Sequence, residues 1–199
     1  MDSYAALRQS MRTARLKLDA NQRIAAADAL VSNLEQLPDF LVDSRVAGYW
    51  AVAGELPLHV AFARLRARNQ TYHLPILDRR KHLLFAAWQP GMSLKTNRFG
   101  IPEPDVEVQD RLAPNELELV LVPLLGFDRK GNRLGTGGGY YDRSFSFLKS
   151  GSRPAQPLLV GIGYHFQEVD DLAPRPWDVA LDFIATEREL ISCADIEDP

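Results

Sequence analysis

The chain has 199 residues, with 23 lysines and arginines, 26 aspartates and glutamates, and a formal net charge of −3. Apolar residues make up 46% and charged residues 25%, which is usual for a soluble globular protein and excludes collagen-like, fibrous and intrinsically disordered classes. Because one domain typically takes about 150 residues, we expect a single domain over residues 1–199. The slightly acidic balance provides no positive footprint for nucleic acid, so a nucleic-acid partner is not expected.

The sequence has one cysteine, Cys193, which excludes an intramolecular disulfide and a cysteine-based zinc cluster. The four histidines show no paired metal-ligand spacing, so a zinc site is not expected either. The N-terminus carries no apolar run of signal-peptide length, and no stretch approaches the roughly 20 apolar residues that cross a membrane. We therefore expect a cytoplasmic monomer without a membrane partner.

Residues 1–37 are predicted to form two helices that pack as a pair on a larger α/β core. The first helix carries an apolar stripe, and Asp2 or Ser3 can cap its start. The stripe consists of Tyr4, Leu7, Met11, Ala14 and Leu18. The second helix presents Ile24, Ala27, Val31 and Leu34 on one face and ends near Pro38.

The rest of the chain alternates between strands and helices. Strands are predicted over residues 45–52, 71–77, 83–88, 117–123, 157–164 and 181–186, a helix over residues 58–68, and a long loop over residues 89–116. The segment LELVLVP at residues 117–123 is typical of a strand covered on both faces in a parallel sheet. This alternation predicts an α/β fold: a three-layer, Rossmann-like domain with a mostly parallel, mixed sheet and helices on both faces.

A glycine-rich segment follows the strand at residues 117–123. Glycine occupies four of the five positions from Gly135 to Gly139, and a helix is predicted to start near Tyr140. A strand, a glycine loop and a helix in this order present backbone N–H groups to an anion, and the missing side chains let a phosphate approach the backbone. The pattern favours a phosphate site over the alternative, a tight connection that binds nothing.

Known phosphate motifs do not match this loop. The P-loop pattern GxxxxGK[ST] is absent, and the Rossmann pattern GxGxxG would need a glycine at Tyr140. Asp142 lies in the first turn of the predicted helix, where it can either complement the helix dipole or bind Mg²⁺ beside a phosphate. Arg133 can either offset phosphate charge or lie at the surface. From the residues alone, both pairs of alternatives stay open.

The segment FDRKGNRLGTGGGYYDR, from Phe127 to Arg143, resembles the signature of the 5-formyltetrahydrofolate cyclo-ligase family. Further motifs of that family follow in the same order over essentially the whole chain. They are Leu7-Arg8, a tyrosine-containing strand followed by Glu55, Gly100–Pro104 (GIPEP), Trp177-Asp178 and Ala185–Glu187 (ATE). The family has a three-layer α/β fold, which agrees with the predicted elements.

The resemblance implies an enzyme that uses ATP and Mg²⁺ to convert 5-formyltetrahydrofolate to 5,10-methenyltetrahydrofolate, with release of ADP and phosphate. Transfer of the γ-phosphoryl group to the formyl oxygen would create a leaving group, and the nitrogen at position 10 would then attack the formyl carbon. Such catalysis depends on positioning and charge stabilisation, so no protein nucleophile is required.

The resemblance also implies roles for individual residues. Arg133 and Tyr141 would be catalytic, and Asp142 and Asp178 would hold Mg²⁺. The ATP contacts would be Tyr4, Arg8, Arg133, Leu134, Gly135, Thr136, Gly137, Gly138, Gly139, Tyr140 and Tyr141. The folate contacts would be Trp50, Glu55, Thr136, Gly137, Gly138, Gly139 and Tyr140. We expect Arg12 and Arg15, on the same helix stripe as Arg8, to face solvent.

The chain departs from the family pattern at three places. Tyr4 stands where many members have lysine, Pro57-Leu58 follow Leu56 where members often have an acidic residue and threonine, and Gly138 replaces a lysine that some members carry. These departures motivate an alternative, a non-catalytic relative that binds folate or nucleotide. A third possibility is a sugar-phosphate isomerase or acyltransferase relative, which would share the phosphate loop without requiring ATP.

Overall fold

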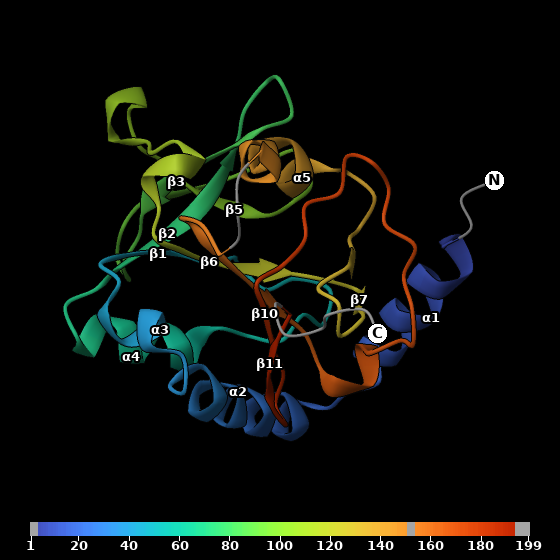
Figure 1. Cartoon of the computed structure of the whole chain (residues 1–199). Helices are drawn as coiled ribbons and strands as arrows, with labels where there is room; N and C mark the ends of the chain where they lie inside the picture. Colours follow the sequence, from blue (N-terminus) through green and yellow to red (C-terminus); the bar gives the residue numbers. More distant parts are fainter. Residues whose placement is uncertain (1–3, 151–153, 194–199) are drawn as a thin grey trace.

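The computed structural model of the chain describes residues 4–150 and 154–193 (Figure 1). A seven-stranded sheet in the order β11-β10-β9-β6-β1-β2-β3 forms the centre. Its strands are β1 (Arg45–Ala47), β2 (Thr71–Leu77), β3 (Leu83–Ala87), β6 (Leu119–Pro123), β9 (Leu158–Ile162), β10 (Phe183–Ala185) and β11 (Leu190–Ser192). The inner strands pair in parallel, and β3 and β11 are antiparallel edges, which confirms the expected mixed, mostly parallel sheet.

The strand order reverses between β1 and β6. From β1 the chain proceeds outward through β2 and β3 on one side, and from β6 it proceeds through β9, β10 and β11 on the other. In open α/β sheets, ligands bind at the carboxyl ends of the strands at such a reversal, because the connecting loops leave in opposite directions. The topology therefore places a candidate site at the loops that follow Ala47 and Pro123.

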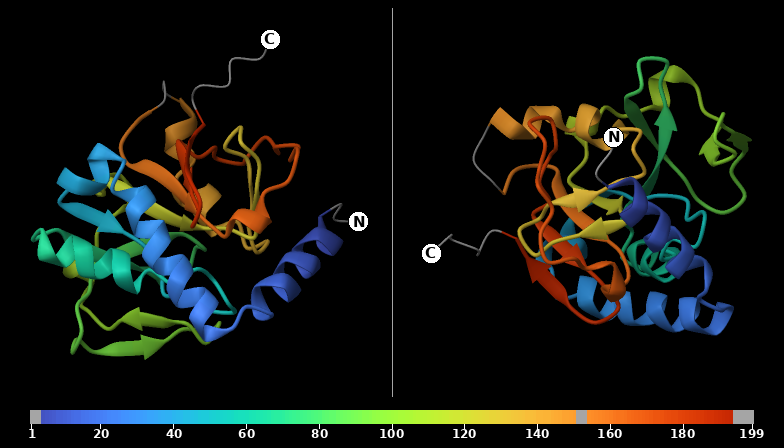
Figure 2. Two further views of the ribbon diagram at one scale, coloured as in Figure 1. Left: turned by 90° about the horizontal axis from the view of Figure 1, so that it is seen from below. Right: turned by 90° about the vertical axis from the view of Figure 1, so that its right-hand side faces the viewer.

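Helices cover both faces of the sheet, as the three-layer prediction requires. On one face lie α2 (Ala20–Leu34), α3 (Pro38–Val42) and α4 (His59–Ala67), and on the other α5 (Tyr140–Ser144) and the 3₁₀ helix Ser146–Ser150 (Figures 1 and 2). Alternate strand residues separate the two cores: Val46 and Leu121 pack beneath α2 and α4, whereas Ala47 and Val120 pack beneath α5. These fully buried aliphatic side chains explain why the central strands are continuously apolar.

The first helix, α1 (Ala5–Leu16), packs elsewhere than α2. Its apolar stripe, including Leu7 and Met11, lies against Leu134 in a small cluster formed by the hairpin of β7 (Gly126–Phe127) and β8 (Arg133–Leu134). Figure 2 shows α1 extending away from α2 toward this hairpin. The expected helix pair is thus divided between two supports, α2 on the sheet and α1 on the hairpin that precedes the glycine loop.

Several local predictions need correction. The strand expected over 45–52 ends at Ala47, and the chain then turns through the left-handed residues Ala53 (φ 49°) and Gly54 (φ 77°) before the helix that follows. The loop expected over 89–116 contains a hairpin of β4 (Leu94–Thr96) and β5 (Pro102–Pro104). β11 was not predicted, and Ile24 is 51% exposed although it was placed on the buried face.

The starts of the first two helices differ in how far the structure describes them. The expected caps of the first helix, Asp2 and Ser3, lie outside the described residues, whereas α2 begins with a capping box of Asp19 and Gln22. Within the described part of the chain, no helix combines the length and the apolar character that crossing a membrane requires.

Candidate active site

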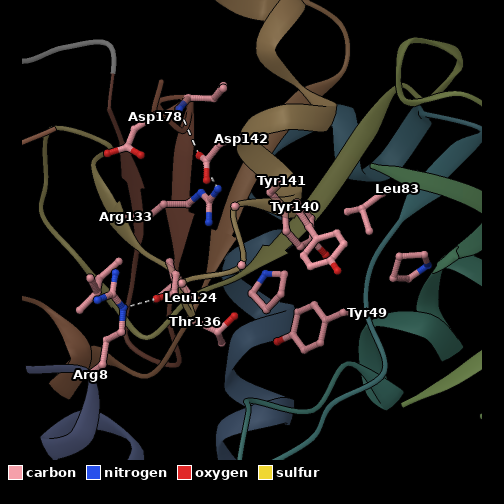
Figure 3. A pocket seen from close by; sticks show the side chains of 18 of the residues that line it. Arg8, Tyr49, Leu83, Leu124, Arg133, Thr136, Tyr140, Tyr141, Asp142 and Asp178 are labelled. Carbon is pink, nitrogen blue, oxygen red and sulfur yellow. Dashed lines mark hydrogen bonds and ion pairs between the residues drawn. The ribbon is translucent and has the colours of Figure 1, made fainter. Parts of the chain in front are cut away.

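A cavity of about 750 Å³ opens beside the reversal of strand order. Its walls come from the loops after β1 and β6, the glycine loop, α1, the β4–β5 hairpin and residues 172–180. Figure 3 shows Arg8, Arg133, Tyr140, Asp142 and Asp178 around this space. The structure brings every site residue expected from the sequence to this one cavity: Tyr4, Arg8, Trp50, Glu55, Arg133, Leu134, Gly135, Thr136, Gly137, Gly138, Gly139, Tyr140, Tyr141, Asp142 and Asp178.

Arginine side chains bind the carbonyl groups of the glycine loop. Arg8 Nε donates to Gly135 O (2.8 Å), Arg12 to Thr136 O (3.4 Å) and Arg143 to Gly138 O (2.5 Å). Among the residues that the structure describes, none accepts a hydrogen bond from the N–H groups of positions 136–139. The loop therefore offers unbound donors in a ring of positive charge, an arrangement that suits an anion.

The loop conformation depends on glycine at one position in particular. Gly137 has φ +101°, and a Cβ atom built there would meet no protein atom within 4 Å, so the space beside it belongs to the cavity. α5, which follows, spans five residues. The sequence predicted that the N-terminus of this helix would help to bind an anion, but the helix is short. The loop N–H groups and the arginines therefore account for the positive character of the site.

Arg133 and Asp142 form an ion pair across the cavity wall. Arg133 Nη2 donates to Asp142 Oδ1 at 2.7 Å, and the N–H of Val179 donates to the same oxygen at 3.3 Å (Figure 3). The guanidinium also lies 5.6 Å from the ring centre of Tyr141. Burial raises the pKa of the Tyr141 hydroxyl, which therefore stays protonated at neutral pH and available as a donor.

Among the described residues, the two carboxylates expected to hold a metal each keep one oxygen free of hydrogen bonds to protein. Asp142 uses Oδ1 for both of its bonds, and Asp178 uses Oδ2 to accept the N–H of Arg175 (2.8 Å). No hydrogen bond to the other oxygen of either residue occurs within the described chain. Mg²⁺ typically takes one or two carboxylate oxygens and completes its shell with phosphate and water, so this donor set fits Mg²⁺.

The wall formed by the loop after β1 contains a buried pair of charges that the sequence did not indicate. Arg15 is 2% exposed, and its Nη1 lies 3.9 Å from Glu55 Oε1 and 3.4 Å from Leu124 O. The expectation that Arg15 faces solvent is therefore wrong, because the loop of Ala53 and Gly54 folds over it. Arg12 is only partly exposed and reaches the glycine loop, so the expectation for it holds only in part.

The Glu55 carboxylate is largely buried and has few hydrogen-bond and ion-pair partners. The N–H of Val52 donates to its Oε2 at 3.0 Å, and Arg15 is its nearest cation. Burial raises the pKa of the Glu55 carboxyl, and the Val52 hydrogen bond and the Arg15 charge oppose this rise without cancelling it. A carboxyl group of this kind, on the wall of a cavity, is typical of a functional site.

The remaining expected residues occupy the outer walls. The Tyr4 hydroxyl accepts a hydrogen bond from the N–H of Ala173 (2.8 Å), and Trp50 packs edge-on against Trp88 with ring centres 5.5 Å apart. The Leu134 side chain is 3% exposed and packs under α1. Sequence reasoning missed the contribution of the β4–β5 hairpin through Asn97 and Phe99, although the adjoining GIPEP motif was a signal.

One group of three potential metal ligands lies outside the cavity, within the described residues. It consists of His165, Glu168 and Glu189. Arg129 pairs with both carboxylates, at 2.7 Å from Glu168 and 2.5 Å from Glu189. The arginine therefore occupies the place that a cation would take.

Comparison with known proteins identifies relatives over nearly the whole length. A sequence profile of the 5-formyltetrahydrofolate cyclo-ligase family matches residues 1–187. The chain is 34% identical over 177 residues to the 5-formyltetrahydrofolate cyclo-ligase of Haemophilus influenzae, covering 88% of this chain and 92% of the relative. It is 30% identical over 178 residues to the Escherichia coli K12 enzyme of the same name, covering 88% and 96%.

Solved structures agree with the sequence relatives. The NMR structure of Aquifex aeolicus 5,10-methenyltetrahydrofolate synthetase superimposes with a TM-score of 0.80 at 30% identity, over 98% of this chain and 95% of that one. A synthetase of the same name from Mycoplasma pneumoniae gives a TM-score of 0.71 at 27% identity, over 94% and 100%. The resemblance seen in the glycine loop thus extends to the whole fold, and the chain is an enzyme that belongs to the 5-formyltetrahydrofolate cyclo-ligase family.

Proposed function

We propose that the chain converts 5-formyltetrahydrofolate to 5,10-methenyltetrahydrofolate with ATP as co-substrate and Mg²⁺ as metal, releasing ADP and phosphate. The observation that carries the proposal is the glycine loop, whose N–H groups at positions 136–139 have no acceptor among the described residues and whose carbonyls are held by three arginines. A triphosphate needs such an array of donors and cations, whereas a tight turn does not. Location in the cytoplasm and a monomeric state stay predictions.

In the proposed reaction, the formyl oxygen attacks the γ-phosphorus of ATP, so that ADP leaves and an imidate-like phosphate forms. N10 then attacks the formyl carbon, phosphate departs with the former formyl oxygen, and N10 loses its proton. Arg133 would offset the charge on the transferring group, and the protonated Tyr141 hydroxyl would donate to one of its oxygens. Cys193, for which burial raises the pKa to about 12, takes no part.

Asp142 and Asp178 would hold Mg²⁺ through their unbound oxygens. The metal, when bound, would neutralise charge on the phosphate oxygens. Because Arg133 pairs with Asp142, one ion pair orients both the guanidinium that would contact phosphate and the carboxylate that would hold the metal.

The folate would lie along the wall that holds Trp50 and Glu55 and would share positions 136–140 of the glycine loop with ATP. Glu55 would accept hydrogen bonds from the donor groups of the pterin, and Trp50 and Tyr140 would supply aromatic surface. These placements rest on the shape and chemistry of the cavity together with the family membership. They would put the formyl group between the buried carboxylate and the phosphate loop.

A direct test mixes the protein with 5-formyltetrahydrofolate and Mg-ATP at mildly acidic pH and follows the near-ultraviolet absorbance of the methenyl product. Growth of the signal that requires both ATP and Mg²⁺ is expected. Folate binding without product would favour a non-catalytic relative. Phosphate release without a folate requirement would contradict the proposed substrate.

Gly137→Ala is expected to raise the KM for ATP at least about tenfold, because a side chain at φ +101° is strained by roughly 1–3 kcal/mol and the loop will relax. Steady-state kinetics with varied ATP measures this change. Gly91→Ala is the matched control, since Gly91 has φ +93°, has equally open surroundings and lies away from the cavity. An equal KM in the two variants would mean that the loop does not bind ATP.

Glu55→Gln is expected to remove a pH dependence from folate binding. Only the carboxylate form accepts from all pterin donors, so affinity should fall as pH decreases through the raised pKa of Glu55. Calorimetric titration of 5-formyltetrahydrofolate between about pH 5 and 8 should show this slope in the natural protein and a flat, weaker response in the variant. The exposed Glu107→Gln variant should retain the slope. A slope that persists in Glu55→Gln would contradict the role.

A further inference from the structure

The tip of the β4–β5 hairpin forms one rim of the cavity and has no role in the reaction described above. Phe99, which lines the cavity, is 56% exposed and meets Tyr140 edge-on with ring centres 6.0 Å apart. The Arg98 guanidinium lies 5.0 Å from the centre of the Phe99 ring and donates to the Tyr140 hydroxyl. An exposed aromatic ring and an arginine are therefore held together beside Tyr140, on the folate side of the glycine loop.

Arg98 carries a positive charge that no acid in the described part of the chain compensates. No carboxylate in residues 4–150 or 154–193 pairs with it, whereas Lys95 on the same hairpin pairs with Asp105 at 2.9 Å. A guanidinium that contacts only a hydroxyl and the face of a ring can still form a bidentate pair with a carboxylate. The rim thus offers one unused anion-binding group.

The tip is held in place by hydrogen bonds within the protein. Asn97 Oδ1 accepts the N–H groups of Phe99 (2.8 Å) and Ile101 (3.1 Å), and Asn97 Nδ2 donates to Glu103 at 2.9 Å. Glu103 is 4% exposed and also accepts the N–H of Leu77 from the sheet (2.8 Å). A preorganised loop loses little entropy on binding, which distinguishes this rim from a mobile surface loop.

We propose that Arg98 and Phe99 form the subsite for the aryl-glutamate end of the substrate, with Phe99 packed against the aminobenzoyl ring and Arg98 paired with glutamate carboxylates. The inference rests on the proposed function, which places the pterin near Glu55 and leaves the opposite end of a long, anionic molecule to be bound. Apolar side chains line the space toward the hairpin, including Pro75, Leu77 and Ile101. An uncharged ring followed by carboxylates matches this order of surfaces, in which the apolar lining and Phe99 are followed by the Arg98 charge.

The test compares two substrates, 5-formyltetrahydrofolate and 5-formyltetrahydropteroate, which lacks the glutamate. In the natural protein the KM for the pteroate should exceed that for the folate by about tenfold, because a hydrogen bond between charged groups at an accessible site is lost. Arg98→Gln should reduce this ratio to near one, and Arg98→Lys should keep part of it. Lys95→Gln, with its neutralised charge on the same hairpin, should keep the full ratio.

Calorimetric binding of both compounds without ATP provides a second readout that does not depend on turnover. Raising the salt concentration should lower the ratio in the natural protein but not in Arg98→Gln. Equal ratios in the natural protein and Arg98→Gln, or no preference for the folate at all, would overturn the subsite while leaving the proposed function intact. If neither compound gave ATP-dependent methenyl product, the subsite and the proposed function would both be overturned.

Discussion

Asp142→Asn is expected to lower kcat/KM for Mg-ATP at least about 100-fold, equivalent to about 2.7 kcal/mol of transition-state stabilisation. The amide oxygen can still accept from Arg133, but the charge and the free carboxylate oxygen that would bind Mg²⁺ are lost. Because the hydrogen bond to a charged group is weakened rather than removed, the cost in unfolding free energy should stay near 1–2 kcal/mol, roughly the lower range for such bonds. Kinetics with varied Mg²⁺ at fixed ATP should show a large rise in the metal concentration required.

A matched control separates this effect from the general loss of an ion pair. Glu35 at the end of α2 pairs with Arg68 at the end of α4 at 2.5 Å, away from the cavity. Glu35→Gln should therefore change stability to a similar extent and leave the Mg²⁺ dependence as it is. If Asp142→Asn responds to Mg²⁺ as the natural protein does, Asp142 is not a metal ligand. A loss of activity that tracks only with unfolding would point to the same conclusion.

Arg15→Met is expected to lower the free energy of unfolding by about 3 kcal/mol at neutral pH, because it leaves the buried Glu55 carboxylate without its nearest positive charge. The pKa of Glu55, already raised, should rise further in the variant. In the native state of the variant, the Glu55 carboxyl then keeps its proton to a higher pH than it does in the unfolded chain. Stability is thus lost as pH increases through this range and recovered as it decreases.

Chemical denaturation at several pH values measures this prediction. The double variant Arg15→Met/Glu55→Gln should recover much of the lost stability, since the uncompensated charge is gone. Arg12→Met, one turn earlier on α1 and partly exposed, is the control and should cost less than about 1 kcal/mol. A pH-independent loss in Arg15→Met would show that packing, and not the charge pair, explains the effect.

Much of the fold was accessible from periodicity and composition. β2, β3 and α4 lie within a residue or two of their expected ranges, because each has a strong apolar pattern and clear turn residues at its ends. β11 and the β4–β5 hairpin were missed because they are three-residue strands whose partners, rather than their own side chains, define them. The strand after residue 45 was overextended because Tyr49, which is buried, and Trp50, which is partly buried, pack on the core outside the sheet.

The residues of the candidate site likewise divide into those that the sequence indicated and those that it did not. The glycine loop with Arg133 and Asp142 forms one contiguous segment, so its likeness to a known signature could be read directly from the order of residues. Glu55, Asp178 and Arg8 were found only because the family resemblance extends to short flanking motifs. Arg15 and Arg98 were not found, because the sequence around each resembles an ordinary solvated segment.

The order of residues already implied the α/β class, the phosphate loop and the family, because each depends on local patterns: apolar periodicity, glycine at left-handed positions and a long contiguous motif. The pairing of Arg15 with Glu55, the ion pair of Arg133 with Asp142 and the placement of Arg98 against Tyr140 arise only when the chain folds back on itself. Desolvation and proximity depend on distances between segments far apart in the chain. For this reason, charged side chains that look alike in the sequence have different roles in the cavity.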